Sequence, residues 1–276
     1  MAIETTNLVS TSEGMISVWD SSSEGIPVIC LHANSTEKAV FHRQFKDLGS
    51  KFRLIALDLP GHGKSDNAKN HSTYSMPGYA KVAFEVMDIM KLSQAIILGW
   101  SLGGHIGIEM CRQQPSRITG LCIIGTPPIP FTQEGFAKGF KPIPIILKLL
   151  GQESFTDAEA REFNEGGGIN LEEEPYLHSA TMRTHGLARS CMFASMMRGE
   201  GGDQKQVVEQ LNIPLAVIAG ENDVGINNEY LINEVKYNNL WSGRVQVIQG
   251  AGHAALLEKP GEFNRILSQF LDDISS

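Results

Sequence analysis

Short apolar runs alternate with longer segments of helical periodicity along the first half of this chain. The runs are rich in Val, Ile and Leu and end at glycine, proline or polar residues, which is typical of strands covered on both faces of a sheet. We expect strands at 14–20, 27–31, 52–57, 95–98 and 117–125. The segments between them predict helices at 39–48, 77–91 and 106–114. This alternation indicates a parallel, doubly wound α/β sheet.

The alternation stops at Thr126, and residues 127–210 have a different composition. This block is first rich in proline and phenylalanine and then contains helical segments interrupted by glycine-rich stretches at 166–168 and 199–202. A block of this length without a sheet strand is typical of an inserted, mainly helical cap. We therefore predict a cap domain at 127–210.

The rhythm of strand and helix returns after the cap. Strands are expected at 215–219 and 245–248, and helices at 227–237 and 262–274. The two flanking parts of the chain predict one core domain formed by 1–126 and 211–276. The predicted fold class is α/β, with a mostly parallel central sheet and helices on both faces.

A strand–turn–helix pattern surrounds Ser101. The expected strand 95–98 leads into the sequence Gly-Trp-Ser-Leu-Gly at 99–103, and a helix follows. In this context a Gly-x-Ser-x-Gly turn raises the serine hydroxyl above the end of a parallel strand in strained backbone. The start of the helix offers free backbone N–H groups that suit an oxyanion. Ser101 is therefore the candidate nucleophile, and the N–H of Leu102 is a candidate oxyanion donor.

The serine needs partners, because a hydroxyl is a poor nucleophile unless a base, itself held by a carboxylate, removes its proton. His253 follows the last expected strand on a glycine-rich loop and is the candidate base. Asp223 follows the strand before it and is the candidate acid, with Glu221 in the same loop as the alternative. The order serine, acid, histidine is the one expected for this architecture. The sequence therefore predicts a Ser101–His253–Asp223 triad.

A second oxyanion donor is expected from the loop after strand 27–31. This loop lies at the same edge of the sheet as Ser101 and can bring another backbone N–H to the reacting carbonyl. The loop begins His-Ala-Asn, and the amide N–H of Asn34 is the candidate donor beside that of Leu102.

Three side chains are candidate substrate contacts. The side-chain amide of Asn34 could bind a substrate carbonyl, and Trp100 stands next to the serine in the sequence. The aromatic and methionine residues of the cap belong mostly to its core, but a minority should line a pocket, and we select Phe163 among them.

Other ionisable residues near strand ends fit structural roles. Asp58 and His62 share one tight loop at 58–65 and are expected to brace it. His105 lies one turn into the helix after Ser101 and is also expected to be structural. The remaining histidines are scattered, with no His-Glu-x-x-His or similar cluster, so neither a metal ion nor a cofactor is predicted.

Composition limits the classes of partner. The 276 residues carry a net charge of −8, which argues against nucleic acid or an anionic membrane as a partner. No apolar stretch approaches the ~18 residues of a membrane span, and the N-terminal residues lack the pattern of a secretory signal. The four cysteines have no Cys-x-x-Cys spacing and are expected to be free thiols. We therefore expect a cytoplasmic protein, and composition does not name its substrate.

Four longer segments carry a resemblance to a known family. They read Tyr-Ser-Met-x-Gly-Tyr-Ala at 74–80, Gly-Trp-Ser-Leu-Gly-Gly-His-Ile-Gly-Ile-Glu-Met at 99–110, Gly-Thr-Pro-Pro at 125–128 and Asn-Leu-Trp at 239–241. With the order of the triad, they resemble the α/β-hydrolase superfamily and, within it, the metal-independent N-acyl-homoserine lactonases. The resemblance implies an α/β-hydrolase fold with an inserted helical cap. It also implies hydrolytic opening of the lactone ring of bacterial quorum-sensing signals without a cofactor.

Two other functions fit the same residues. A general carboxylesterase would use the same triad on small acyl esters in a different pocket. A receptor of the hydrolase fold would keep the triad and signal through its cap. Dehalogenases and epoxide hydrolases are disfavoured, because they normally have an aspartate where this chain has Ser101.

Overall fold

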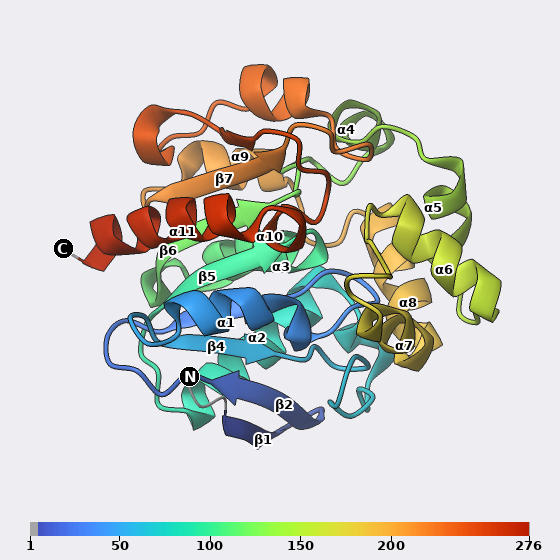
Figure 1. The fold of residues 1–276 in the computed structure, drawn as a ribbon, viewed down its shortest axis with the longest axis horizontal. Helices are drawn as coiled ribbons and strands as arrows, with labels where there is room; N and C mark the ends of the chain where they lie inside the picture. Colours follow the sequence, from blue (N-terminus) through green and yellow to red (C-terminus); the bar gives the residue numbers. More distant parts are fainter. Residues whose placement is uncertain (1–4, 276) are drawn as a thin grey trace.

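The computed structural model describes residues 5–275, and a twisted central sheet runs through it (Figure 1). Its strands are β1 (Thr5–Thr11), β2 (Gly14–Asp20), β3 (Val28–Leu31), β4 (Leu54–Leu57), β5 (Ala95–Trp100), β6 (Ile118–Ile124), β7 (Leu215–Gly220) and β8 (Gln246–Ile248). They lie in the order β1-β2-β4-β3-β5-β6-β7-β8. The pairs β1–β2 and β2–β4 are antiparallel, and the other pairs are parallel. The carboxyl ends of β3 to β8 therefore meet along one edge.

Helices cover both faces of this sheet. On one face lie α1 (His42–Leu48), α10 (Ala255–Glu258) and α11 (Pro260–Ser275), and on the other α2 (Met76–Ile89), α3 (Leu102–Gln113) and α9 (Gln204–Gln210). Successive strand side chains point to opposite faces. Along β3, for example, Ile29 and Leu31 enter one core, whereas Val28 and Cys30 enter the other. This strand is apolar at every position, and does not alternate with polar residues, because both faces of the sheet are buried.

The chain between β6 and β7 contains the helices α4 (Gln133–Gly139), α5 (Pro144–Leu149), α6 (Asp157–Gly166), α7 (Tyr176–Arg183) and α8 (Gly186–Met197). Figure 1 shows α5 to α8 grouped together at the side of the sheet where the parallel strands end. The next helix, α9, falls within the range predicted for the cap but packs against α3 of the core. The α5–α8 group therefore lies beside the strand ends.

Two elements differ from those expected. The first strand, β1, was not predicted, because its sequence is polar and an edge strand buries little: Leu8 is 60% exposed and Val9 is 7% exposed. The helix expected at 227–237 forms only at Tyr230–Glu234. The asparagine side chains before it bind other backbone groups instead, with Asn227 donating to the Lys138 carbonyl and Asn228 to that of Gly220. Such side-chain bonds compete with helix formation.

Two further features concern the described chain as a whole. Within residues 5–275, none of the helices combines the length and apolar character needed to cross a membrane. The cysteines at positions 30, 111, 122 and 191 are all free thiols, as predicted.

Candidate active site

Ser101 lies in the sharp turn between β5 and α3. Its φ of 53° and ψ of −112° fall in a region that non-glycine residues rarely adopt. The turn is tight: a Cβ at Gly99 would lie 2.3 Å from the carbonyl oxygen of Gly103. The backbone N–H of Ser101 donates to the Ile124 carbonyl at 2.9 Å, which attaches the turn to the end of β6. Only glycine at position 99 permits this geometry.

The start of α3 also lies against the end of β3. A Cβ at Gly103 would stand 2.0 Å from the carbonyl oxygen of Leu31. The loop that follows β3 and carries Asn34 therefore begins beside the first turn of α3. In that turn the Leu102 N–H has no acceptor within the helix. The two predicted oxyanion donors thus belong to segments that the fold places side by side.

The loop after β3 contains one strained residue. Ser35 has a φ of 59° although it carries a side chain, and it is fully buried. Ala33 is not among the residues with positive φ. Position 33, directly after His32, therefore does not need the conformational freedom of a glycine. The residue with the left-handed backbone is Ser35, two positions later.

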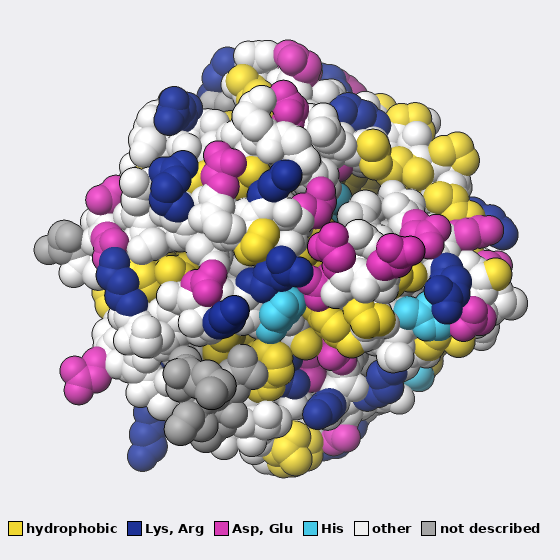
Figure 2. Space-filling model, in the orientation of Figure 1, with side chains coloured by type: hydrophobic (Ala, Val, Ile, Leu, Met, Phe, Trp, Pro, Cys, Tyr) yellow, Lys and Arg dark blue, Asp and Glu magenta, His cyan; other side chains and the backbone are white. Residues whose placement is uncertain are grey.

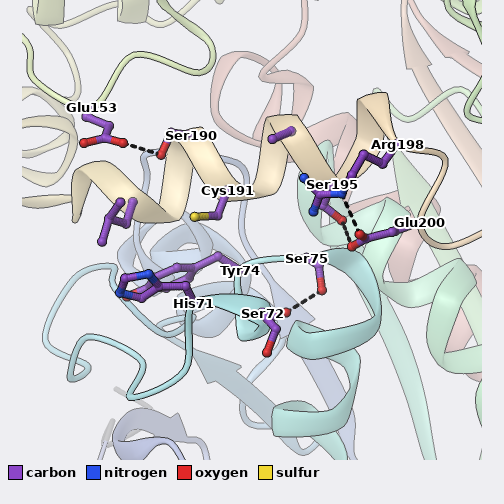
Figure 3. A pocket seen from close by; sticks show the side chains of 12 residues that line it. His71, Ser72, Tyr74, Ser75, Glu153, Ser190, Cys191, Ser195, Arg198 and Glu200 are labelled. Carbon is purple, nitrogen blue, oxygen red and sulfur yellow. Dashed lines mark hydrogen bonds and ion pairs between the residues drawn. The ribbon is translucent and has the colours of Figure 1, made fainter.

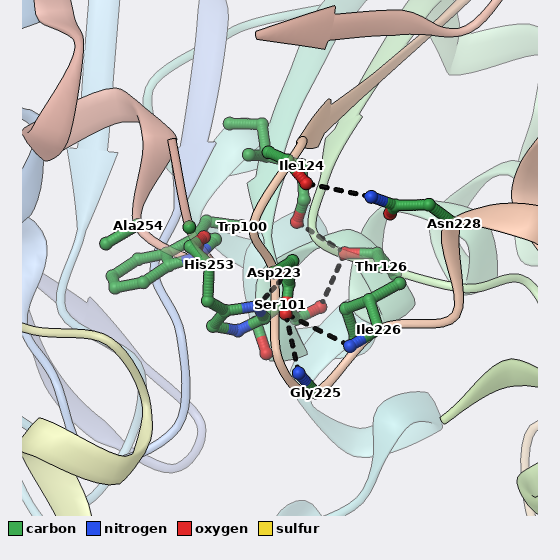
Figure 4. Close-up of polar contacts among 12 residues, drawn as sticks. Trp100, Ser101, Ile124, Thr126, Asp223, Gly225, Ile226, Asn228, His253 and Ala254 are labelled. Carbon is green, nitrogen blue, oxygen red and sulfur yellow. Dashed lines mark hydrogen bonds and ion pairs between the residues drawn. The ribbon is translucent and has the colours of Figure 1, made fainter. Parts of the chain in front are cut away.

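His253 and Asp223 form a hydrogen-bonded pair beside Ser101 (Figure 4). The Nδ1 of His253 lies 2.8 Å from Oδ2 of Asp223. The other carboxylate oxygen, Oδ1, accepts from the backbone N–H groups of Gly225 at 2.9 Å and Ile226 at 3.0 Å. Glu221, the alternative acid, instead accepts from the backbone N–H of Gly250 at 2.9 Å. Asp223 therefore has the geometry that fixes the imidazole, and Glu221 does not.

The charges of this pair shift both pKa values. Burial alone would lower the pKa of His253, but the negative charge of Asp223, their hydrogen bond and nearby Glu258 raise it above the ordinary value. Burial likewise would raise the pKa of Asp223, but the imidazole and the bonds from Gly225 and Ile226 lower it. The arrangement thus stabilises an imidazolium facing a carboxylate, the state a general base reaches after taking a proton.

Several backbone and side-chain contacts hold the His253 ring. The indole N–H of Trp100 donates to the His253 carbonyl at 2.9 Å. A Cβ at Gly125, just after β6, would lie 2.9 Å from the ring itself. From the cap, a Cβ at Gly168 would lie 3.6 Å from the backbone nitrogen of His253. The candidate base therefore lies between the sheet end and the cap.

Glu258 is a residue that sequence reasoning missed. Its carboxylate accepts from the N–H of Gly252 at 2.7 Å and from that of Ala254 at 3.0 Å, so it spans the residues on both sides of His253. A glutamate a few residues beyond a glycine-rich loop, in the single turn of a short helix, resembles a capping pattern and could have drawn attention to it.

A family model of the alpha/beta hydrolase fold matches residues 26–140. The N-acyl homoserine lactonase AidH complexed with N-butanoyl homoserine is 39% identical, with a TM-score of 0.93 over 99% of this chain and 98% of that one. The chain belongs to the α/β-hydrolase family.

Two further relatives of this α/β hydrolase are informative. A mutant of AidH complexed with N-hexanoyl homoserine is 38% identical, with a TM-score of 0.94 and coverage of 99% and 98% of the two chains. The pimeloyl-acyl-carrier-protein methyl ester esterase of Salmonella typhimurium is 26% identical over 260 residues, which cover 90% of this chain and 95% of the esterase. Both relatives extend across the cap as well as the core.

The hydrolase buries Asp58, His62 and His105. Asp58 forms an ion pair with Lys38 at 2.6 Å. Burial holds the pKa of His62 well below its ordinary value. His105 bonds through Nδ1 to the side chain of Gln204 at 2.6 Å, and burial lowers its pKa to about 4. Their contacts are those of bracing residues.

The other predicted substrate contacts occupy different environments. Trp100 is 1% exposed and its ring lies 5.8 Å from that of His253. Phe163, on α6, packs its ring 5.4 Å from that of Phe155 within the cap. The Asn34 side chain donates weakly to the Leu150 carbonyl at 3.5 Å. A contact of each with substrate stays a prediction.

Apolar side chains flank the triad on the cap side. Figure 2 shows a group of hydrophobic side chains on the surface around α5, where Leu147 is 59% exposed. Just before this helix, the Cδ1 of Ile143 would lie 3.3 Å from a Cβ at Gly225, next to the Asp223 loop. Ile143 therefore places an apolar side chain beside the loop that carries Asp223.

A separate cavity of about 500 Å³ opens at the seam between α8 and the segment before α2 (Figure 3). Its polar lining includes His71, Glu153, Cys191, Arg198 and Glu200, and no triad residue borders it.

Among residues 5–275, the side chains of His, Cys, Asp and Glu form no group of three or more that could hold a metal ion.

Proposed function

We propose that this α/β hydrolase opens the lactone ring of N-acyl-homoserine lactones by serine catalysis. The observation that carries the proposal is its likeness to the lactonase AidH, which holds at 39% identity over 99% of this chain and so includes the cap. The cap is the part of an α/β hydrolase that covers the substrate. A likeness confined to the core would support only the fold.

In the proposed first step, His253 removes the proton of Ser101 as the hydroxyl attacks the lactone carbonyl. The carbonyl oxygen becomes an oxyanion, to which the backbone N–H groups of Leu102 and Asn34 donate. Each such donor contributes on the order of 3 kcal/mol to the transition state. Asp223 stabilises the imidazolium and keeps the working tautomer.

In the second step, His253 gives its proton to the ring oxygen as the carbon–oxygen bond breaks. The new alcohol remains tethered to the acyl-enzyme, so it can attack the ester and close the ring again. Hydrolysis wins only if His253 activates a water molecule before the ring closes. The water oxygen then adds to the acyl carbon, Ser101 leaves with its proton restored, and the product is an N-acyl-homoserine.

The proposed substrate pose uses the apolar side chain of Ile143 beside the Asp223 loop. The acyl chain would lie along Ile143 and the cap, with Trp100 and Phe163 as further contacts. The substrate amide would be bound by polar groups such as the side chain of Asn34. The partner is thus a small, uncharged acyl lactone.

The test is a panel of N-acyl-homoserine lactones with chains of four to twelve carbons, with ring opening followed by mass spectrometry. We expect turnover that a chelator leaves unchanged, because the triad supplies the base and the oxyanion donors itself. Wild-type protein that opens none of these lactones would contradict the proposal. So would full activity in a Ser101→Ala variant.

A general carboxylesterase is the second candidate, favoured by the 26% identical methyl ester esterase. It would use the same residues on open-chain esters. The kcat/KM for nitrophenyl esters, compared with that for the lactones, separates the two. A clear preference for nitrophenyl butanoate over every lactone would favour the esterase.

A further inference from the structure

Among the hydrogen bonds between the predicted cap and the loop that carries the candidate oxyanion donor, the shortest comes from one buried hydroxyl. Thr181, on α7, donates through Oγ1 to the backbone carbonyl of Ser35 at 3.0 Å. Both residues are fully buried. Ser35 directly follows Asn34, so a single peptide unit separates the bonded carbonyl from the peptide that presents the Asn34 N–H.

A third buried residue fixes the direction of this bond. The Nδ2 of Asn164, on α6, donates to the Ala160 carbonyl at 2.7 Å and to Oγ1 of Thr181 at 3.0 Å. The threonine hydroxyl oxygen therefore accepts a hydrogen bond from the amide, and its own hydrogen remains free to be donated. Its distance to the Ser35 carbonyl, 3.0 Å, is shorter than the 3.3 Å to Oδ1 of Asn164. The hydroxyl proton is thus directed at the loop.

Hydrogen bonds from the core hold the same loop near its two ends, while Ala33 packs into the core and Thr36 bonds the Ala33 carbonyl within the loop. At the start, Nε2 of His32 accepts from the Leu59 N–H at 3.0 Å. At the end, the backbone N–H of Lys38 donates to Asp58 at 2.7 Å. Between these anchors lies Ser35 with its φ of 59°, a conformation that relaxes unless something holds it.

Arg189, on α8, holds Thr181 in turn. Its guanidinium donates to the carbonyls of Gln152 at 2.7 Å, Glu153 at 2.8 Å and Thr181 at 3.2 Å. Burial lowers the pKa of this arginine to about 10, so it is still charged near neutral pH. Arg189 thus holds the backbone of Thr181, and its Nη1 also lies 3.5 Å from Oγ of Ser35 in the loop.

We propose that Thr181 is a positioning residue for the oxyanion site: its hydroxyl holds the Ser35 carbonyl and thereby the Asn34 N–H in the place that the transition state requires. This inference rests on the proposed serine mechanism. It makes the seating of the cap a condition for catalysis as well as for substrate binding. If α7 moves away from the core, the bond from Thr181 to the Ser35 carbonyl breaks and the loop around Asn34 is no longer held there.

The test compares three variants of the full-length protein. Thr181→Val keeps the shape but removes the hydroxyl, and Thr181→Ser keeps the hydroxyl. Thr184→Val is the matched control, because Thr184 is also a buried threonine at the end of α7 but donates only to the Ala180 carbonyl at 2.9 Å. Each variant is assayed for kcat and KM on a lactone and for its melting temperature.

We expect Thr181→Val to lower kcat by about tenfold with little change in KM, because a displaced donor weakens the transition state and not the ground state. Butylboronic acid, which forms a tetrahedral adduct with the serine, should bind more weakly by a similar factor. Thr181→Ser should retain most of the activity, and Thr184→Val should retain the wild-type kcat.

Equal kcat values for Thr181→Val and Thr184→Val would overturn the inference, as would a loss confined to KM. If the valine variant does not fold, the comparison of Thr181→Ser with Thr181→Ala answers the same question, with an expected kcat ratio of about ten. Failure of the proposed function is a separate result. It appears as wild-type protein without lactonase activity, and the Thr181 series is then assayed on nitrophenyl butanoate, whose hydrolysis needs the same donors.

Discussion

At the scale of single residues, the candidate chemistry depends on backbone strain at Ser101. The φ of 53° raises the hydroxyl above the sheet, and the surrounding glycines leave the space for it. Such a conformation costs of order 1–3 kcal/mol and persists because the packing around it enforces it. The residue is thus held ready for attack before any substrate arrives.

Replacing Ser101 by alanine should remove activity and leave the fold intact. Alanine adopts the same backbone with similar strain, so the melting temperature should change little. The turnover number should fall by roughly 10⁴-fold or more, as expected when a triad nucleophile is lost. Lactone assays and thermal unfolding measure the two effects. A folded variant with substantial residual activity would show that another group attacks the substrate.

The pH dependence should follow His253. Its raised pKa means that the protonated, inactive form persists to a higher pH than in an ordinary histidine, so kcat/KM should rise as pH increases through that pKa. In Asp223→Asn the negative charge is gone, so burial should lower the pKa of His253. The rise of kcat/KM with pH should then occur at lower pH, while kcat falls by about 10⁴-fold.

A pH–rate profile, corrected for spontaneous lactone hydrolysis, measures the shift. Glu221→Gln is the control, because Glu221 lies in the same loop but bonds the Gly250 N–H and not the imidazole. Its profile should match that of the wild type. A shifted profile in this variant and not in Asp223→Asn would reassign the acid.

At the scale of elements, the short helix α10 and the loop before it act as one unit. Glu258 accepts from the N–H groups on both sides of His253, so Glu258→Ala should leave two donors without a partner. We expect a loss of about 1–2 kcal/mol in the free energy of unfolding and a lower kcat. Urea denaturation and lactone kinetics provide the measurements. Glu262→Ala, an exposed glutamate in the first turn of α11, should change neither.

The sequence predicts the elements whose pattern is strong. β5, β6 and β7 are continuous apolar runs, and their ends carry the residues that the motif logic selected, including Ser101 and Asp223. These assignments follow from chain order and from the rule that parallel strands end at one edge. β1 was missed because an edge strand needs few buried side chains. The helix at 227–237 was overestimated because asparagine side chains there bond backbone elsewhere.

Parts of the candidate site depend on three-dimensional contacts that no sequence pattern encodes. The closeness of Gly125 to the His253 ring joins segments far apart in the chain. The same holds for the bond from Thr181 to Ser35, which crosses from the cap to the core. Propensity and periodicity describe neighbours along the chain, so they cannot identify such pairs. Chain order alone could select the candidate triad but not the contacts that surround it.

At the scale of the whole molecule, removing one partner of a buried ion pair should cost more stability than removing one partner of a surface pair. Lys38 and Asp58 form an ion pair at 2.6 Å with side-chain exposures of 4% and 1%. Lys51 and Asp272 are also 2.6 Å apart but are 52% and 48% exposed. Lys38→Met leaves an unpaired buried carboxylate and should cost about 3–5 kcal/mol. Lys51→Met should cost less than about 1 kcal/mol.

Chemical denaturation of the two lysine variants measures this difference. Because the Lys38 backbone also anchors the loop of Asn34, Lys38→Met should lower kcat as well as stability. Lys51→Met should leave kcat at the wild-type value. Equal losses of stability in both variants would mean that water reaches Asp58 in the folded protein.

The contact between Gly125 and His253 offers a way to sort related sequences. Position 125 has a φ of 53°, and any side chain there would come within 2.9 Å of the imidazole. A homologue that retains the serine, aspartate and histidine but carries alanine or a larger residue at this place would have its base displaced. Genome surveys that count intact triads would score such a protein as an enzyme. The residue at position 125, directly after β6, would instead identify it as a homologue that retains the fold without the hydrolytic activity.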